Sequence, residues 1–446
     1  MISITNKFFS RLKGIFSTSF PALKNRDYRY FWTGQMISVT GTWMQTTAQA
    51  WLVLTLTESP LLLGIMGAAR FAPLLVLSLF AGVIVDKVPK RTILLITQFV
   101  SMLLALILAA LVFSGFVRYW HILVLSALLG TVKTFDIPAR QAFMFELVGK
   151  ETLLNAIALN SSVFNLARII GPSVAGILTA VAGMGWAFLI NGVSFIAVIV
   201  GLYMIQTKGT PKQVRKTRTM PEIKAGLKYL MSSTSLKSTM AILAVVATFG
   251  MNYNVLIPVF AREVLGADAT GFGYLMSSLG VGSLIGALFV ATRSKRGPRK
   301  IRLYIIPLVV ATLFVLTGLN TSFFLSAVLV GLIGFFNIGF TTTANSFVQI
   351  NTEDRYRGRV MSVYSLIFAG SSPFGNLYVG GIADALGAGA SFVIAGLTTG
   401  GLSLLICWRR LRIWLKKEKT TEETLGLIDS KDDQQSIDIT QDRKSA

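Results

Sequence analysis

Two arginines, Arg70 and Arg168, lie near the middle of long apolar segments. Insertion scales put the cost of such a charge at roughly 3 kcal/mol at the centre of a membrane helix, so an intramembrane cation calls for a functional explanation. One hypothesis is a basic cavity that engages anionic or polyphenolic groups or that modulates a proton site. The other is a structural arginine that hydrogen-bonds carbonyls and amides between helices. Both interpretations fit these residues.

Polar side chains also recur at helical spacing within apolar segments, as at Asn165 and Arg168 or at Gln45 and Gln49. Such stripes favour a water-filled cavity, with hydrogen bonding between helices as the alternative. Four asparagines are the counterparts in the second half of the chain. The predicted cavity residues are therefore Gln45, Gln49, Arg70, Asn165, Arg168, Asn252, Asn254, Asn337 and Asn376.

A proton-coupled carrier needs a titratable group that is exposed to both sides of the membrane in turn. The carboxylates of this sequence lie near the ends of the predicted spans, and none is clearly central. Asp86 and Asp136, both near the end of the membrane that carries the termini, are our candidates for proton coupling.

Several classes of chemistry lack their usual residues. The chain has one histidine, His121, and one cysteine, Cys407. It contains no His-Glu-x-x-His, no Gly-x-Ser-x-Gly and no nucleotide-binding Gly-x-x-x-x-Gly-Lys-Ser/Thr sequence. We therefore expect neither an enzyme nor an ATP-driven pump, and no cofactor or bound metal. A channel or a purely structural scaffold is the remaining alternative outside carriers.

The elements that must position these residues are membrane helices. Hydrophobic residues make up 53% of the 446-residue chain and charged residues only 14%, against about 25% in soluble domains. The apolar runs have the length of about 20 residues that a helix needs to cross a bilayer. We predict spans at about residues 31–55, 61–85, 92–113, 119–136, 153–181, 186–205, 238–261, 270–292, 303–320, 323–345, 361–385 and 388–408.

These spans predict an all-α membrane protein with twelve transmembrane helices in two six-helix halves. The first half covers residues 1–205 and the second residues 238–408, joined by a cytoplasmic loop over 206–237. A cytoplasmic tail follows over 409–446, and its distal part is expected to be disordered. The halves resemble weak repeats, since Leu153 to Asn160 is similar to Arg357 to Tyr364, as in known transporters.

The formal net charge of +22 is distributed by topology. All but five of the 42 Lys and Arg residues lie in the loops and tails on the side of the termini, and this bias predicts cytoplasmic termini. The basic excess therefore indicates contact with membrane lipids rather than nucleic acid. We expect a monomer in a bacterial cytoplasmic (inner) membrane.

The segment from Gly82 to Arg91 resembles the signature between the second and third helices of the major facilitator superfamily. It reads Gly-Val-Ile-Val-Asp-Lys-Val-Pro-Lys-Arg, with a proline where that signature has a second glycine. The resemblance implies a gating motif made of Gly82, Asp86, Lys87, Lys90 and Arg91.

A second segment, Gly171-Pro-Ser-Val-Ala-Gly176, resembles the motif that marks exporters within this superfamily, with alanine in place of one glycine. Gly171, Pro172 and Gly176 are its matching residues; close packing of small residues is the alternative explanation. Trp43-Met-Gln45 and Pro138-Ala-Arg-Gln141 further resemble a bacterial efflux branch that includes the enterobactin exporter and macrolide-type efflux carriers.

The resemblance implies a secondary active transporter that binds a small-molecule substrate. It would export a small amphipathic molecule, drug or siderophore-like, by alternating access and in exchange for protons. The alternative on the same fold is an importer or a lipid translocator.

Overall fold

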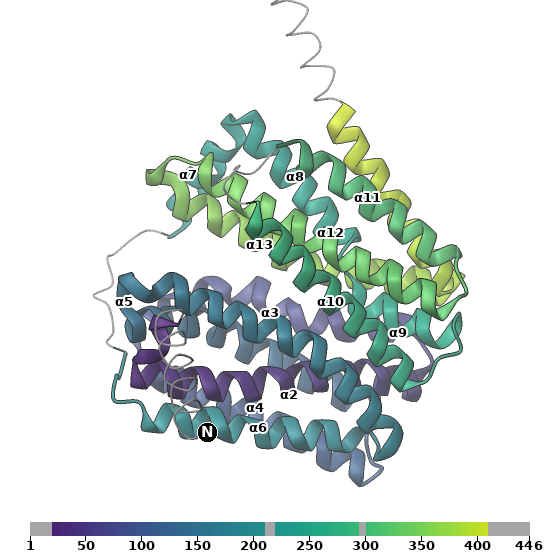
Figure 1. Ribbon diagram of the computed structural model, residues 1–446, viewed down its shortest axis with the longest axis horizontal. Coiled ribbons are helices and arrows are strands. Elements are labelled where there is room, and N and C mark those ends of the chain that lie inside the picture. Colours follow the sequence, from purple (N-terminus) through teal and green to yellow (C-terminus); the bar gives the residue numbers. More distant parts are fainter. Residues whose placement is uncertain (1–19, 210–218, 294–299, 409–446) are drawn as a thin grey trace, which may run out of the picture.

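The computed structural model describes residues 20–209, 219–293 and 300–408 of the chain. Every regular element in these ranges is a helix, as Figure 1 shows. The predicted tail at 409–446, whose distal part is expected to be disordered, lies outside the described residues. The all-α membrane fold expected from the sequence is therefore the fold of the described chain.

The first half contains a short 3-10 helix and five α-helices. They are η1 (Pro21–Lys24), α2 (Arg26–Thr57), α3 (Pro60–Lys87), α4 (Lys90–Phe113), α5 (Tyr119–Val181) and α6 (Met184–Met204). α7 (Thr219–Ser232) then lies within the segment expected to be a loop. The second half contains α8 (Thr234–Phe249), α9 (Tyr253–Glu263), α10 (Ala269–Thr292), α11 (Lys300–Leu319), α12 (Phe323–Ile350), α13 (Asp354–Leu386) and a last helix over 388–408.

The helices differ from the predicted spans at two places: α5 covers the predicted spans at 119–136 and 153–181 with the loop between them, and the predicted span at 238–261 is divided. α5 is 63 residues long, far more than one bilayer crossing requires, and its helical geometry is broken at Gly149, where φ is 68°. The predicted span at 238–261 is interrupted between Phe249 and Tyr253, so that α8 and α9 are separate helices. The length of an apolar run indicates a helix that is buried or spans a membrane, but it does not indicate where that helix is interrupted.

Nine helices in the described ranges are long and apolar enough to cross a membrane. That count treats α5 as one helix and α8 with α9 as one, and it omits the long helices α2 and α13. The count of twelve spans therefore stays a prediction.

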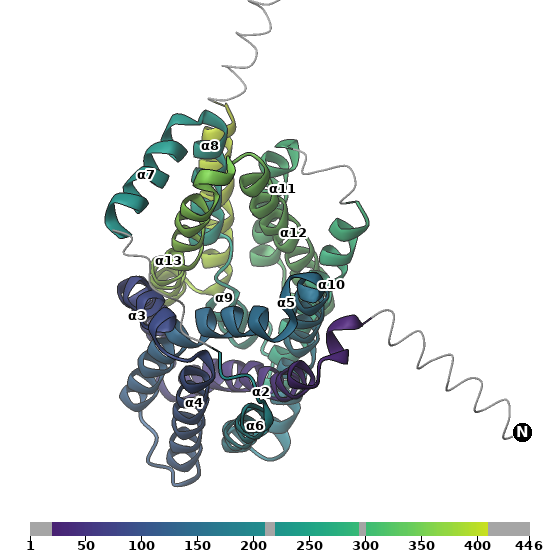
Figure 2. The same ribbon diagram turned by 90° about the vertical axis from the view of Figure 1, so that its left-hand side faces the viewer.

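Polar residues cap the starts of helices on both sides of the molecule. Asn25 caps α2, where its side chain accepts a hydrogen bond from the backbone N–H of Tyr28. Ser59 caps α3 in the same way by accepting from the backbone N–H of Leu62. We call the side on which α2 begins and the last helix ends the terminal side, and the opposite side, which includes the turn at Ser59, the far side. Figure 2 faces the terminal side, with α2, α4 and α6 below and α7, α8 and α11 above.

Two helix pairs join the halves: α3 packs against α13, and α5 packs against α10. Glycines allow the close approach. A methyl group at Gly176 would lie 2.6 Å from the carbonyl oxygen of Ala269, and one at Gly273 would lie 2.6 Å from that of Pro172. Gly171 packs in the same way on Trp43 within the first half. The segment that resembles an exporter motif thus forms part of the α5–α10 seam between the halves.

Candidate functional site

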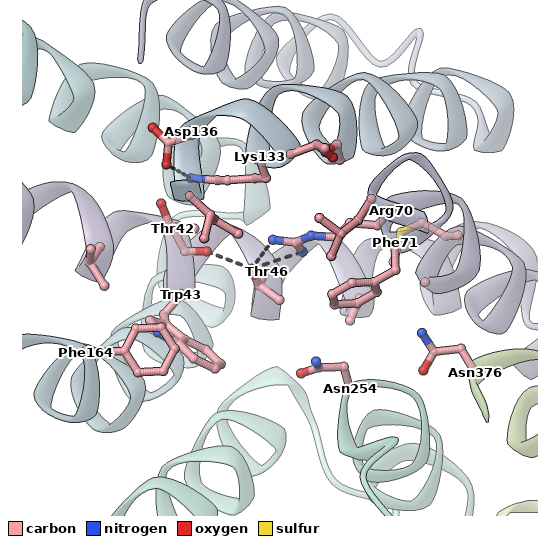
Figure 3. Close-up of a pocket in the computed structure, with 18 of the residues that line it drawn as sticks. Thr42, Trp43, Thr46, Arg70, Phe71, Lys133, Asp136, Phe164, Asn254 and Asn376 are labelled. Atoms are coloured by element: carbon pink, nitrogen blue, oxygen red, sulfur yellow. Dashed lines mark hydrogen bonds and ion pairs between the residues drawn. The ribbon is translucent and has the colours of Figure 1, made fainter. Parts of the chain in front are cut away.

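A cavity of about 530 Å³ lies between the two halves. Helices α2, α3 and α5 of the first half supply most of its wall, and α9 and α13 of the second half supply the rest (Figure 3). The polar and aromatic residues that line it are Thr42, Trp43, Thr46, Arg70, Phe71, Lys133, Thr134, Asp136, Arg140, Gln141, Asn160, Phe164, Asn254 and Asn376.

Arg70 projects from α3 into this cavity. Its two terminal nitrogens each donate a hydrogen bond to Oγ1 of Thr46 on α2, both at 3.2 Å. No carboxylate among the described residues pairs with it, so its charge is balanced neither by Asp136 nor by any other acid within ion-pair distance. A guanidinium held by one hydroxyl retains donors for a ligand.

Asp136 is the carboxylate of the cavity wall, and its side chain is only 2% exposed. It accepts hydrogen bonds from Thr97 at 3.1 Å and from Gln98 at 2.6 Å, both on α4. Arg140, one turn further along α5, donates at 2.5 Å, and the Lys133 ammonium lies 4.0 Å away. The lining therefore carries three cations and one carboxylate, all from the first half.

Aromatic rings form the apolar part of the wall. Trp43 of α2 and Phe164 of α5 meet edge to face, with their ring centres 5.5 Å apart. Figure 3 shows these rings and Phe71 on the side of the cavity that faces Asn254 and Asn376 of the second half. The cavity thus offers charge on one side and aromatic surface with two amides on the other.

Of the nine predicted cavity residues, Arg70, Asn254 and Asn376 line the cavity and the other six do not. Gln45 accepts a hydrogen bond from Asn191 of α6. Gln49 donates to Ser126 of α5 at 2.6 Å. Both glutamines are buried between helices of the first half and hydrogen-bond a neighbouring helix there, although Oε1 of Gln49 has no partner among the described residues.

Asn165 and Arg168 of α5 also lie outside the lining. Asn165 donates to the carbonyl of Ser161 in its own helix at 2.9 Å. The Arg168 guanidinium lies 5.6 Å from the centre of the Trp43 ring, a cation–π distance. The buried Nε of Arg168 has no hydrogen-bond partner among the described residues, so the contact with Trp43 is not the network of carbonyls and amides that the structural hypothesis expected.

Asn252 and Asn337 are found at the break between α8 and α9. Asn252 donates to the carbonyl of Thr248 at 2.6 Å, and Asn337 of α12 donates to the carbonyl of Gly250 at 3.4 Å. Carbonyls freed by a helix break in a membrane must find such donors. These two asparagines therefore brace the break and do not line the cavity.

Sequence reasoning missed Arg140, which it assigned to a loop, and gave Lys133 no part in the cavity. Lys133, Asp136 and Arg140 are spaced by three and four residues, which is a single helix face. That spacing would have identified the cluster had α5 been predicted to continue past residue 136.

The gating motif lies on the terminal side, away from the cavity. Asp86 is exposed and makes no ion pair with the residues that the structure describes. Lys90 is 1% exposed and lies 3.5 Å from Glu146. Arg91 donates to the carbonyls of Leu202 at 2.7 Å and Tyr203 at 2.8 Å, fixing the end of α6. These contacts of Lys90 and Arg91 all lie within the first half, which they stabilise.

Polar contacts between the halves are found on the far side. Arg262 of α9 donates to Glu58 at 2.9 Å, and Asp384 of α13 accepts from the hydroxyl of Ser59 at 2.6 Å. Ser173 and Ser277 add a contact of 2.6 Å along the α5–α10 seam. Among the described residues, no hydrogen bond joins the halves at the terminal side, where Figure 1 shows α5 and α7 apart. The halves are thus closed beyond the cavity at the far side only.

Two helical halves around a central cavity with charged and aromatic walls define an α-helical membrane carrier. Residues 17–432 match the family model described as "Transmembrane secretion effector". The chain belongs to this family of the major facilitator superfamily, and it is a secondary transporter and not an enzyme.

Two relatives cover most of the chain. The staphyloferrin A transporter of Staphylococcus aureus is 26% identical over 88% of this chain and 98% of its own. The multidrug efflux pump Tap of Mycolicibacterium fortuitum is 28% identical over 80% of this chain and 89% of its own. These similarities agree with the efflux branch that the sequence motifs indicated.

Solved structures show the same fold at low sequence identity. A POT family transporter in complex with a thioalcohol-conjugated peptide has a TM-score of 0.69 at 11% identity, covering 87% of this chain and 96% of its own. A bacterial homologue of the lysosomal transporter Spinster, inward-facing and occupied, has a TM-score of 0.67 at 13% identity, covering 86% and 97%.

Proposed function

We propose that this secondary transporter exports a small amphipathic molecule, drug or siderophore-like, by alternating access and in exchange for protons. The cavity between the halves carries the proposal. It has charged, amide and aromatic walls, and the polar contacts between the halves lie beside it and beyond it on the far side. Such a cavity suits a cargo that enters from the terminal side.

The direction of transport follows from the side on which the cargo enters. The excess of Lys and Arg in the loops of the terminal side favours a cytoplasmic location for that side. The relative named as a multidrug efflux pump supports the same direction. Import on the same fold is the alternative, and it requires the far side to capture the cargo.

Asp136 is our candidate for the proton site. It is the carboxylate that lines the cavity among the described residues, whereas Asp86 lies at the exposed terminal end of α3. A carboxylate in the cavity wall can be reached from whichever side the cavity faces. Asp86 is better placed to act in a gate that forms when the terminal sides of the halves approach each other.

Transport into inverted membrane vesicles tests this function. The vesicles would be energised by respiration and offered a panel of macrolides, lipophilic cations and catecholate-type anions. Export predicts saturable uptake of at least one class, lost on addition of an uncoupler and accompanied by a pH change inside the vesicles. Uptake only by right-side-out vesicles would replace the exporter with the importer. Uptake that continues after the pH gradient has been collapsed would contradict exchange for protons.

A further inference from the structure

We infer that the cargo is an amphipathic dianion, whose anionic groups are held by Arg70, Lys133 and Arg140. Carboxylate, sulfonate and phosphate groups share the required chemistry. The inference rests on the proposed function for the identity of the cavity, but it concerns binding alone. It can therefore be tested without any transport.

The charge of the cavity wall carries the first step. Three cations and the single carboxylate Asp136 leave two positive charges uncompensated among the described lining residues. Burying an unpaired charge is costly, and an anionic ligand offsets that cost. A ligand with two negative charges brings the wall to neutrality, whereas a cationic ligand adds to the repulsion.

The donors are arranged to share a ligand. Arg70 reaches from α3, and Lys133 reaches from α5, where the two helices touch: a methyl group at Gly130 would lie 2.1 Å from the carbonyl oxygen of Arg70. Figure 3 shows both side chains directed into the same cavity. A guanidinium can bind a carboxylate through two parallel hydrogen bonds. The Arg70 guanidinium hydrogen-bonds only the Thr46 hydroxyl among the described residues, so it keeps N–H donors for such a group.

Lys133 and Arg140 offer the second anion-binding position. They lie seven residues apart on α5, about 10 Å along the helix, with Asp136 between them. Asp136 is also held by Thr97 and Gln98, so it keeps hydrogen-bond donors when a cation turns to the cargo. Thr97 and Gln98 therefore continue to stabilise the Asp136 carboxylate when Lys133 or Arg140 binds an anionic group of the cargo.

The remaining wall requires an apolar body on the cargo. Trp43, Phe71 and Phe164 present aromatic surface, while Asn254 and Asn376 are the polar contacts from the second half. A cavity of about 530 Å³ is within the range of roughly 300–1,000 Å³ that accepts one drug-sized molecule. The second half thus contacts the body of the cargo, and the first half binds its charge.

A matched series of probes on one ring system separates charge from aromatic contact. We would measure binding of 2,6-naphthalenedicarboxylate, 2-naphthoate, 2-naphthalenemethanol and 2-naphthylmethylammonium by calorimetry. The full chain would be held in nanodiscs of zwitterionic lipid, so that lipid anions do not compete. The expected order of affinity is dianion, monoanion, neutral alcohol and then cation.

Two variants locate the effect. Arg70→Gln and Lys133→Gln are each expected to weaken dianion binding about tenfold or more, the loss of a charged hydrogen bond. Binding of the neutral alcohol should change less than about twofold. Arg168→Gln removes the same charge from α5 outside the cavity lining, and it should leave the dianion affinity within about twofold. Arg70→Lys keeps the charge without the fork and should give an intermediate loss.

Three results would contradict the proposal that the cargo is a dianion. They are cation binding as tight as dianion binding, equal dianion affinity in the parent and both cavity variants, and silence of the whole series with folded protein. Each leaves the direction of transport untouched. Conversely, failed uptake in inverted vesicles would reject export while a positive binding series stands, so the two failures are distinguishable.

Discussion

Arg262, in the last turn of α9, donates a hydrogen bond from Nη2 to Oε1 of Glu58 at 2.9 Å, and this contact joins the two halves on the far side. Its Nη1 also donates to the carbonyl of Leu54 on α2. The Glu58 side chain is 78% exposed, so the ion pair alone stabilises closure only weakly. The carbonyl contact is part-buried, and it makes Arg262 the more important partner.

The first prediction compares the two partners of this contact. Arg262→Gln should raise the population of the far-open state about fivefold, corresponding to about 1 kcal/mol for the lost charged donor. Glu58→Gln should change it less than about twofold. Spin labels at Phe116→Cys and Thr321→Cys, in a Cys407→Ser background, would report the far-side separation. Identical distance distributions in both variants would contradict this assignment.

A second prediction concerns glycines that differ in their surroundings. A methyl group at Gly130 would clash with the carbonyl of Arg70 at 2.1 Å, whereas nothing lies within 4 Å of one at Gly82. Gly130→Ala should therefore destabilise the protein by about 1–3 kcal/mol, and Gly82→Ala should leave its stability unchanged or raised. Thermal unfolding of the purified variants measures both.

Gly82→Ala has a second expected effect. If the gating motif packs closely only when the terminal side closes, this variant should transport slowly although it is fully stable. Transport by Gly82→Ala at the rate of the parent protein would show that the transport cycle does not require close packing at Gly82.

A third prediction separates the two aspartates. Asp136→Asn leaves Lys133 and Arg140 without their carboxylate, and loss of one partner of a buried pair costs about 3–5 kcal/mol. Asp86→Asn should not affect stability, because Asp86 is exposed, but it should weaken transport. Melting temperature and vesicle uptake, measured on both variants, test this contrast. Equal destabilisation by the two substitutions would contradict it.

A fourth prediction tests the structural role of Gln45. Gln45→Leu leaves the Asn191 amide buried without its acceptor, which should cost about 1–2 kcal/mol. The double variant Gln45→Leu with Asn191→Leu should recover part of that loss, since neither partner is then orphaned. Naphthalenedicarboxylate affinity should stay the same in both. A loss of naphthalenedicarboxylate affinity with unchanged stability would instead assign Gln45 a role in substrate binding.

The fold was predictable because membrane helices leave a strong signal in a single sequence. Long apolar runs located the helices, and the segment at Gly82 indicated the superfamily. The break in α5 at Gly149 lies in the loop that the sequence predicted between two spans, whereas the break at Gly250 lies inside one predicted span and was not predictable from its apolar run. Helicity within a predicted loop, as in α7, was hidden by its polar composition.

The cavity was only partly predictable, and α2 shows why. Thr42 and Thr46 point in one direction from this helix, and Gln45 and Gln49 point on average about 60° away around its axis. The threonine face lines the cavity, while the glutamine face hydrogen-bonds Asn191 and Ser126. Polarity alone does not distinguish a face that lines a cavity from a buried face that hydrogen-bonds neighbouring helices. Only the neighbouring helices determine which is which.

Alternation of the two halves is the central claim, and a reversible cross-link at the far side tests it most directly. Ser59 and Asp384 are hydrogen-bonded at 2.6 Å across the halves, so Ser59→Cys with Asp384→Cys, in the Cys407→Ser background, can form a disulfide there. The oxidised protein should bind naphthalenedicarboxylate normally but carry out no uptake in inverted vesicles, and reduction should restore uptake. Undiminished uptake by the fully cross-linked protein would contradict alternating access.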